Sequence, residues 1–471
     1  MKQEFNVADP LPREYFGSGV NWFDYLGTGG FYGRFSGYPL DDVIYPEVTD
    51  VVGWQKILET LDELSPSFIR YGLNPETVID AEGNVDKNSL AFDRLEILSK
   101  WASAKEVPIE LDTFLIPSYY EFKTDETEIS ERFCNMAAAN NIEYARKFVG
   151  PLLHYIVRER GMSAISLFNP VNEPINYGVY QVPENGPDVY IHYVEMFQEI
   201  RKALDDLGIE ASEVGLIGID GDIPLEYPLL QHAARGIDLN PFVSAYSIHS
   251  YRTRFDYQPP TAVCPDSEPL EITVDRHVRQ LVNYCEKRNR PLLACEVGAF
   301  YYGKVENPNG PASDEGTLLT LETIIRMANI GVASALIWSP MNPNNIDGHW
   351  ALFKLAGSKI EKYLTPWNAY AAMMRVLVRG STIYPVKSIS PQYPYQHVHG
   401  LLTDKNGQIR GLFVNDSPNE VMQISLQSSV LSLPVNFQVN SKFYGSDELV
   451  QSTVASNSVF EIPPLGFIEI F

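Results

Sequence analysis

Ser166-Leu-Phe-Asn-Pro-Val-Asn172-Glu173-Pro174 is a short apolar run that stops abruptly at polar residues. A second stretch, Pro291-Leu-Leu-Ala-Cys-Glu296-Val-Gly298, has the same form. Each pattern is typical of a buried strand that delivers one carboxylate to its end. A carboxylate in such a place costs desolvation free energy unless it is paired or used. The two stretches therefore indicate a buried sheet with acidic groups at its strand ends.

Similar apolar runs alternate with amphipathic stretches through most of the chain. We predict eight strands: Val20–Tyr25, Phe68–Gly72, Pro108–Phe114, Ala164–Asn169, Val214–Ile219, Val243–His249, Pro291–Val297 and Ala333–Ser339. The intervening patterns predict helices at Trp54–Leu64, Arg94–Ala104, Glu131–Arg160, Glu271–Arg288, Glu315–Ile330, Pro366–Val378 and between Asp188, as N-cap, and Gly208. Strands that alternate with helices indicate a parallel sheet with right-handed crossovers. Eight repeats predict an α/β fold of the closed (β/α)8 TIM-barrel type. An open doubly wound sheet is the alternative, which the lack of a glycine-rich phosphate motif after the first strand disfavours.

The pattern changes after Arg379. Apolar residues recur with a period of two in Met422–Leu426 and Phe467–Phe471, and Asn406-Gly407 is a hairpin signal. We predict that residues 380–471 form a small antiparallel β-sandwich domain, behind a catalytic barrel of residues 17–379. Residues 1–16 form an N-terminal segment that could pair with the sandwich.

Charge and cysteine usage exclude several classes of partner. The 471 residues contain 36 Lys and Arg against 60 Asp and Glu, a net charge of −24. Such a surface repels phosphate backbones and anionic lipid, so nucleic acid and membrane are disfavoured as partners. The four cysteines are scattered with no metal-binding spacing, and the N-terminus lacks the apolar core of a secretory signal. We therefore expect a cytoplasmic protein with reduced thiols, unless a leader preceded this sequence.

Two carboxyl groups that face one cavity can split a glycosidic bond. One protonates the leaving oxygen, and the other acts as an anion at the anomeric carbon. Glu173 and Glu296 fit these roles because both follow apolar strands. A strand-terminal glutamate can also cap a helix or pair with an arginine. Taken alone, each of the two glutamates could have such a structural role instead of a catalytic one.

Other strand ends add polar and aromatic groups. Arg70 could hold a neighbouring carboxylate ionised or serve as a structural ion pair, and both can be true. His249 and Tyr251 stand two residues apart and face the same way. Tyr251 could donate to Glu296, whereas His249 could simply be a buried, hydrogen-bonded histidine. Trp338 offers a flat face to a sugar ring, or it belongs to the core.

Together these motifs resemble clan A of the retaining glycoside hydrolases. The resemblance covers roughly residues 17–379 and includes the segment from Asp347 to Phe353; it does not resolve the family. It implies that Glu173 is the general acid/base and Glu296 the nucleophile. It also implies that Asn172 binds the sugar 2-hydroxyl, that Arg70 and Tyr251 orient and ionise Glu296, and that the subsite is lined by His249 and Trp338.

One position departs from the clan pattern. Many clan families place a histidine on the third strand, whereas this chain has Asp112. Asp112 could bind a pair of sugar hydroxyls or be a structural carboxylate. This difference makes the identity of the sugar uncertain, but it affects the expected mechanism less.

The resulting hypothesis is a retaining β-glycoside hydrolase without metal or cofactor, acting on an oligosaccharide or small glycoside. Long loops such as Gly27–Tyr38, Arg252–Pro269 and Phe300–Pro311 favour a pocket, and hence an exo-acting β-glucosidase, β-xylosidase, β-galactosidase or β-mannosidase. The alternatives are an endo-acting glycanase of the cellulase or mannanase type and an inactive sugar-binding barrel. A metal-dependent barrel lyase or isomerase would need at least three convergent ligands, and we see no such cluster in the sequence. Linkage and oligomeric state stay open.

Overall fold

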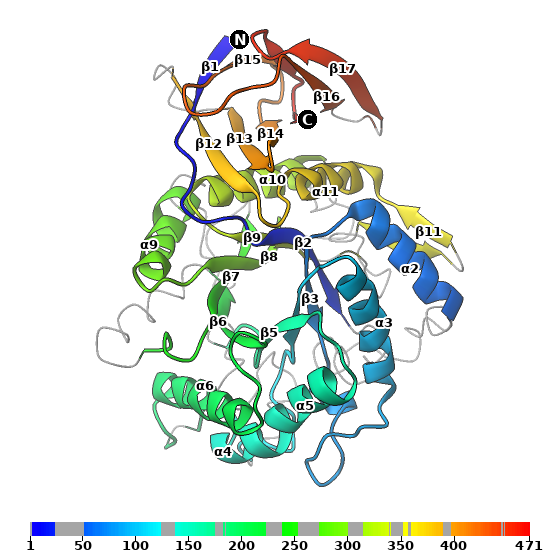
Figure 1. Cartoon of the computed structure of the whole chain (residues 1–471), viewed down its shortest axis with the longest axis vertical. Coiled ribbons are helices and arrows are strands. Elements are labelled where there is room, and N and C mark those ends of the chain that lie inside the picture. Colours follow the sequence, from blue (N-terminus) through cyan, green and yellow to red (C-terminus); the bar gives the residue numbers. More distant parts are fainter. Residues whose placement is uncertain are drawn as a thin grey trace.

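The computed structural model describes residues 2–23, 51–123, 137–174, 182–183, 185–222, 238–252, 273–299, 314–338, 340, 352–356, 359–389, 397–443, 446 and 448–471. Figure 1 shows a ring of strands and helices with a separate sheet lying against one side. Most of the predicted loops at the strand ends, including Gly27–Tyr38, lie outside the described residues.

Eight parallel strands close into a barrel, as predicted. In order they are β2 (Gly17–Phe23), β3 (Phe68–Gly72), β4 (Ile109–Asp112), β5 (Ile165–Asn169), β6 (Gly215–Asp222), β7 (Ala245–Arg252), β8 (Leu292–Ala299) and β9 (Ser334–Ile337). The barrel closes because β2 pairs with β9 as well as with β3. The carboxyl ends of all eight strands therefore meet at one mouth, which is where a barrel of this kind holds its active site.

Helices cover the outside of the barrel. The described helices are α2 (Val51–Leu64), α3 (Leu90–Ala104), α6 (Val189–Asp206), α10 (Asp314–Asn329) and α11 (Leu364–Val376), together with a short turn η2 (Pro75–Thr77). Two further segments alternate α-helix with wider π turns: α4 (Asn141–Glu143), η4 (Tyr144–Val149), α5 (Gly150–His154), η5 (Tyr155–Glu159), then η7 (Thr273–Val278) and α9 (Arg279–Lys287). As predicted, Asp188 caps α6, because its carboxylate accepts from the backbone N–H groups of Tyr190 and Ile191.

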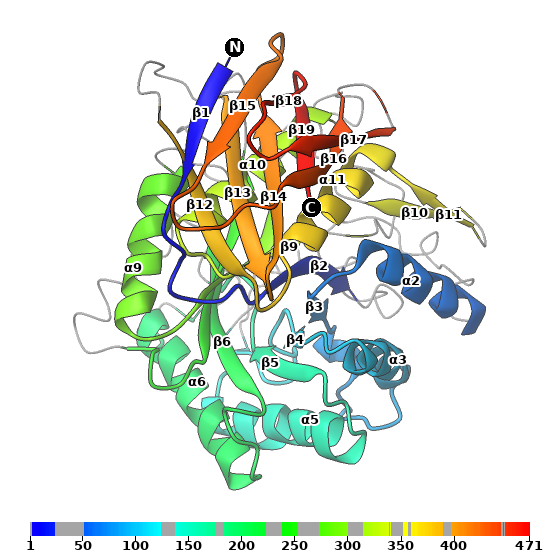
Figure 2. The same ribbon diagram turned by 45° about the horizontal axis from the view of Figure 1, so that its top comes forward.

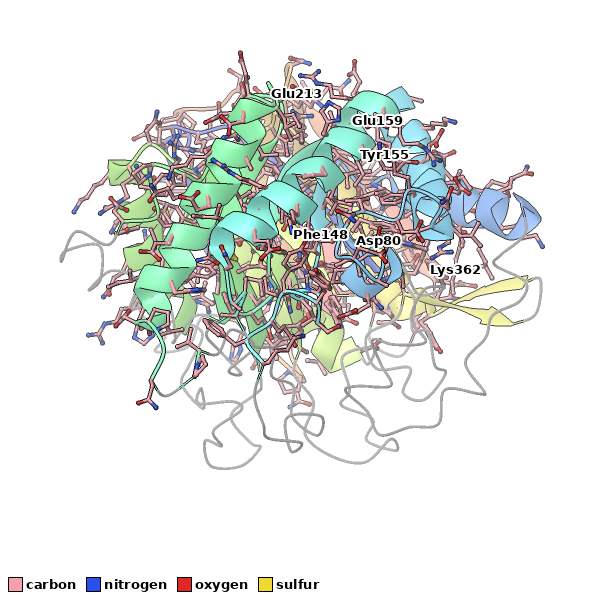
Figure 3. The ribbon with its side chains drawn as sticks, turned by 90° about the horizontal axis from the view of Figure 1, so that it is seen from below. Asp80, Phe148, Tyr155, Glu159, Glu213 and Lys362 are labelled. Carbon is pink, nitrogen blue, oxygen red and sulfur yellow. The ribbon has the colours of Figure 1, made fainter. Side chains whose placement is uncertain are left out.

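Polar pairs link η5 to neighbouring segments of the chain, on the face where Figure 3 labels Tyr155, Glu159 and Glu213. Lys87 Nζ lies 2.7 Å from Glu159 and 5.0 Å from the centre of the Tyr155 ring. Arg158 donates to Glu213 over 2.6 Å. These contacts are largely exposed, so each contributes at most about 1 kcal/mol. No helix among the described residues has the length and apolar character needed to span a membrane.

Nine of the other described strands form one sheet. Its order is β17 (Leu449–Ala455), β16 (Asn436–Lys442), β19 (Gly466–Ile470), β14 (Gln408–Asn415), β13 (Val398–Lys405), β12 (Thr382–Ser388), β1 (Lys2–Val7), β15 (Met422–Gln427) and β18 (Phe460–Ile462). A separate two-stranded hairpin joins β10 (Phe353–Ala356) to β11 (Lys359–Lys362). The N-terminal strand β1 pairs antiparallel with β12 and parallel with β15. The sheet is therefore mostly antiparallel, and the two ends of the chain complete it together.

This sheet folds over on itself and encloses its own apolar core. Phe437 of β16 and Phe460 of β18 come from opposite ends of the strand order, yet their ring centres are 6.0 Å apart. The core also contains Phe5, Val398, Phe413, Met422 and Ile470, all fully buried. The predicted hairpin turn is present at Asn406 and Gly407, where φ is 56° and 81°.

The sheet rests on α10 and α11, as Figure 2 shows. Arg375 of α11 donates twice to the carboxylate of Glu469 in β19, over 2.8 and 2.7 Å. Arg326 of α10 lies 3.1 Å from a ring nitrogen of His399 in β13. Glu469 is 1% exposed, so its charge depends on Arg375 and on Asn440, which donates over 2.9 Å.

Candidate active site

The structure brings Glu173 and Glu296 together at the barrel mouth. Glu173 follows the end of β5, and Glu296 lies in β8. One carboxylate oxygen of each lies within 4.8 Å of the other and of a ring nitrogen of His249. A separation above about 7 Å would have contradicted a joint role in retention; the observed one is shorter than that, slightly below the separation of about 5–5.5 Å that is typical of retaining enzymes.

The backbone holds Glu173 in an unusual conformation. Its φ is +42°, in the left-handed region that a residue with a side chain rarely adopts. Two backbone bonds fix this corner: Glu173 N–H donates to Asp220 O over 2.9 Å, and Asn172 N–H donates to Phe114 O over 3.0 Å. Such strain persists only where surrounding contacts impose it, and it aims this carboxylate into the mouth.

Three groups surround the carboxylate of Glu296. Arg70 Nη1 donates to Oε1 over 2.5 Å, Tyr251 Oη donates to Oε2 over 2.6 Å, and His249 Nδ1 lies 3.5 Å from Oε2. Burial raises the pKa of Glu296, and the nearby Glu173 raises it further. His249, Arg70 and Tyr251 lower this pKa, but the net shift is upward. The sequence analysis expected Arg70 and Tyr251 to ionise Glu296. The contacts are present, but they do not fully offset burial.

Arg70 is the centre of the cluster and is 1% exposed. Four carboxyl groups surround its guanidinium, and the side chains of Asn21 and Asn172 accept from it over 3.0 and 2.6 Å. Its nitrogens lie at 3.3 Å from Glu110, 2.8 Å from Asp112, 2.6 Å from Asp220 and 2.5 Å from Glu296. Arg70 therefore orients the proposed nucleophile and also neutralises the barrel interior, so both roles considered for it are present in the geometry.

One arginine cannot neutralise four buried carboxylates, so their pKa values separate. Burial raises the pKa of Glu110 to about 7 and that of Asp112 to about 8. Asp220 goes the other way: against its burial, Arg70 and His249 lower its pKa to about 2. Near neutral pH, Asp220 thus carries the fixed negative charge while Asp112 stays largely protonated.

His249 bridges two acidic residues instead of only lining the mouth. Its Nδ1 lies 2.7 Å from Glu173 Oε1, and its Nε2 lies 3.0 Å from Asp220 Oδ1. The side chain is fully buried. Burial opposes its charge, but Glu296 and Asp220 raise the pKa of His249 well above its ordinary value. His249 is therefore both a buried histidine with hydrogen-bond partners on each ring nitrogen and a residue in contact with the two glutamates of the site.

The remaining predicted residues lie around this cluster. Trp338 follows β9, packs partly buried against the barrel core and donates its backbone N–H to Val297 O over 3.2 Å. Asp112 is fully buried and accepts from the backbone N–H of Phe114 over 2.8 Å. Of the two roles left open for Asp112, this burial fits the structural carboxylate.

Four residues of the cluster were not predicted from the sequence: Asp220, Glu110, Asn21 and Asn169. The predicted fifth strand ended at Ile219, one residue before Asp220, whereas β6 continues to Asp222. Inspecting the next residue would have found Asp220 by the same strand-end rule. Glu110 stands two residues before Asp112, so the alternation of the strand places both on one face. Asn169 donates to Asp220 over 2.5 Å.

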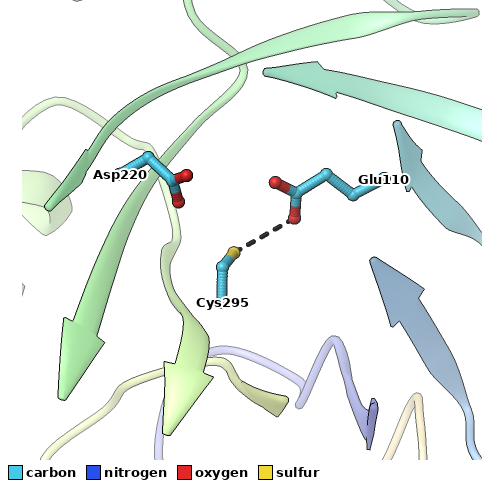
Figure 4. Close-up of side chains that lie close together, drawn as sticks. All are labelled: Glu110, Asp220 and Cys295. Atoms are coloured by element: carbon cyan, nitrogen blue, oxygen red, sulfur yellow. Dashed lines mark hydrogen bonds between the residues drawn. The ribbon is translucent and has the colours of Figure 1, made fainter. Parts of the chain in front are cut away.

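Within the part of the chain that the structure describes, two clusters contain enough donor types to consider a metal ion. One consists of Glu173, His249 and Glu296, and the other of Glu110, Asp220 and Cys295. Figure 4 shows the second converging from separate strands, with the Cys295 thiol donating to Glu110 over 3.1 Å. Burial raises the pKa of Cys295 well above its ordinary value, so the sulfur keeps its proton. Arg70 already supplies a cation to this cluster, so its residues fit a metal ion poorly.

Comparison with known proteins supports the fold. No protein-family model and no curated protein matches the chain. Solved structures with the same architecture include a GH30 endoxylanase from Clostridium papyrosolvens C71, with a TM-score of 0.63 and 12% identity over 99% of both chains. An endo-β-1,6-glucanase matches with a TM-score of 0.61 and 10% identity over 99% of this chain and 93% of that one. A GH51 arabinofuranosidase from Xanthomonas axonopodis pv. citri matches with 0.61 and 14% identity over 100% and 99%.

These structural neighbours are glycoside hydrolases, and their families belong to clan A. At this level of identity the likeness shows the fold: a closed eight-stranded barrel with an accompanying, mostly antiparallel sheet. The fold expected from the clan resemblance is therefore confirmed, and the family stays unresolved.

Proposed function

We propose that the chain is a retaining glycoside hydrolase in which Glu173 is the general acid/base and Glu296 the nucleophile. The observation that carries this proposal is the pair of carboxylate oxygens within 4.8 Å at the barrel mouth. That spacing leaves no room for the water that an inverting enzyme places between its carboxyl groups. The structural neighbours support the same class of enzyme.

The reaction has two displacement steps. In the first, Glu173 gives its proton to the glycosidic oxygen while Glu296 attacks the anomeric carbon and forms a covalent glycosyl ester. In the second, Glu173 removes a proton from water, and the water oxygen displaces Glu296 from the same carbon. Two inversions restore the starting configuration. Arg70 and Tyr251 hold Glu296 in line throughout, because both donate to it.

The neighbours favour endo-acting or other specificities over the exo-acting enzyme expected from the sequence. Their names describe an endoxylanase, an endo-β-1,6-glucanase and an arabinofuranosidase. The loops behind the exo-acting hypothesis, such as Arg252–Pro269, lie almost entirely outside the described residues. We therefore propose an endo-acting β-glycanase first, and an exo-acting glycosidase on the same machinery second.

A substrate panel with stereochemical readout tests this function. Xylan, β-1,6-glucan, xyloglucan, aryl β-glycosides and an aryl α-L-arabinofuranoside are incubated with the enzyme, with and without chelator. The first anomer released is recorded by NMR, and the Glu173→Gln/Glu296→Gln double variant controls for contaminating activity. Release with retained configuration, unaffected by chelator, supports the proposal. Inverted product, or no hydrolysis of any substrate, contradicts it.

A further inference from the structure

Both carboxylate oxygens of Asp220 have side-chain partners in the cluster. Its Oδ1 lies 3.0 Å from His249 Nε2, and its Oδ2 accepts from Arg70 Nη2 over 2.6 Å and from Asn169 Nδ2 over 2.5 Å. The side chain is fully buried. Arg70 and Asn169 donate through N–H groups, and an ionised Asp220 can only accept, so His249 Nε2 must carry a proton in this arrangement. Both oxygens then act as acceptors, which is what a carboxylate provides and an amide does not.

Asp220 is connected to Glu173 by two separate routes. Its backbone carbonyl accepts from the Glu173 N–H over 2.9 Å. Its side chain reaches the Glu173 carboxyl through His249, whose Nδ1 lies 2.7 Å from Oε1. Both Asp220 and Glu173 have positive φ, at 60° and 42°. The position of the proposed acid/base is therefore set by Asp220 through backbone and side chain alike.

Acidic groups face both ring nitrogens of His249. Asp220 from β6 faces Nε2, whereas Glu173 after β5 and Glu296 from β8 face Nδ1 at 2.7 and 3.5 Å. Behind Asp220 lie Arg70 from β3 and the Glu110–Cys295 pair from β4 and β8. A neutral imidazole has one N–H, so one nitrogen would turn a lone pair either toward Asp220 or toward the carboxylate that Glu173 becomes when it releases its proton. The imidazolium donates to both sides.

We propose that Asp220 is a positioning residue of the reaction, holding His249 as an imidazolium whose Nδ1–H stabilises the carboxylate that Glu173 becomes when it releases its proton. This inference rests on the proposed function. In that step the O–H bond of Glu173 breaks and its proton passes to the glycosidic oxygen. The electron pair of the anomeric C–O bond leaves with that oxygen, and a lone pair of Glu296 forms the new bond. His249 and Asp220 neither gain nor lose a proton.

Asp220→Asn tests this role with little change in shape. The single acceptor of the amide is claimed by Arg70 and Asn169, so its NH2 group faces His249 Nε2. His249 then keeps a proton only on Nδ1 and loses its positive charge. General acid catalysis contributes about 10²–10⁴-fold, and we expect Asp220→Asn to lose about 10–100-fold of this in kcat/KM for aryl glycosides with poor leaving groups. A dinitrophenyl glycoside needs no proton, so its kcat/KM should fall less than about threefold.

Two further variants separate this role from a structural one. Cys295→Ala alters the same buried cluster, but the thiol donates to Glu110 and not to Asp220. It should therefore keep the wild-type dependence on the leaving group. In a His249→Gln background, adding Asp220→Asn should change that dependence no further, because Asp220 acts through His249.

An equal loss for all leaving groups, or an effect of Asp220→Asn that persists without His249, overturns the proposal. A second measurement does not need the Asp220 variant to fold. In wild-type protein labelled with 15N-histidine, the His249 signal, identified by its loss in His249→Gln, should show both nitrogens protonated at pH 7; a neutral ring overturns the proposal. A wild type that hydrolyses no glycoside overturns the proposed function and this inference with it, whereas an active wild type with a neutral His249 overturns this inference alone.

Discussion

The interior of the barrel mouth and the core of the nine-stranded sheet are both buried, but they are built from opposite kinds of side chain. The mouth encloses an arginine, a histidine and acidic groups, among them Arg70, Asp220 and Glu296. The sheet core is apolar, with Phe413 and Phe437 at its centre. Buried charge is stable only while every partner is present, whereas apolar burial is roughly proportional to area. The barrel mouth is therefore arranged for chemistry, and loss of one side chain there should destabilise the fold more than its apolar area alone would predict.

Removal of Arg70 should have the largest effect on both stability and activity. Arg70→Met leaves four carboxyl groups without their shared cation, and loss of one partner from a buried ion pair costs about 3–5 kcal/mol. Urea unfolding measures the loss. Arg158→Met is the matched control, because its pair with Glu213 is partly exposed and should contribute less than about 1 kcal/mol. Equal losses in the free energy of unfolding for the two variants would show that the Arg70 network contributes no more to stability than an exposed ion pair.

Truncation of Phe413 should match that loss of stability without touching the chemistry. Phe413 is fully buried in the sheet core, and Phe→Ala in a core costs about 3–5 kcal/mol. The folded fraction of Phe413→Ala should keep its kcat/KM, whereas folded Arg70→Met should not. Phe443 is 44% exposed, so Phe443→Ala should change the free energy of unfolding by no more than about 0.5 kcal/mol. A large fall in kcat/KM for Phe413→Ala would contradict the separation of the two regions.

Local sequence patterns predicted the elements of both regions, but not the contacts between residues that lie far apart in the sequence. Strands of the barrel were found because apolar runs end in polar residues, and the hairpin at Asn406-Gly407 because its turn requires positive φ. The Arg70 network was found only in part. Asp220 lies one residue past the predicted strand, and which carboxylates share Arg70 depends on strands far apart in sequence. The pairing of β1 beside β15 is likewise a tertiary choice that no local pattern encodes. The cytoplasmic location stays a prediction.

The contact between the outer helix α11 and the nine-stranded sheet should show an intermediate effect. Arg375→Ala removes the two bonds to Glu469, a carboxylate that is 1% exposed. Leaving a buried charged group short of its partner costs about 1–3 kcal/mol, reduced by the partial exposure of Arg375. Arg375→Lys should restore part of the loss in thermal unfolding. An unchanged melting temperature for Arg375→Ala would show that the sheet is held by apolar packing alone.

A further expected effect concerns pH. Burial raises the pKa of Asp112 to about 8, whereas an unfolded chain releases this proton near pH 4. The folded protein then binds more protons between these values, so this group makes stability fall as pH rises from about 4 to 8. Asp112→Asn should make the free energy of unfolding less dependent on pH between 5 and 7, measured by urea unfolding at each pH. A steeper fall in the variant would contradict the protonated state of Asp112.

The most direct test of the central claim uses Glu173→Ala with azide and an activated aryl β-glycoside. The variant retains Glu296, so the first covalent step proceeds with a leaving group such as dinitrophenol. Azide fits the space left by the Glu173 side chain and attacks the glycosyl-enzyme from the β face, so NMR should show a β-glycosyl azide. In Glu296→Ala, attack by azide comes from the opposite face and gives the α product. An α-azide from Glu173→Ala, or wild-type rates in Glu296→Ala, would contradict the assignment of the two glutamates.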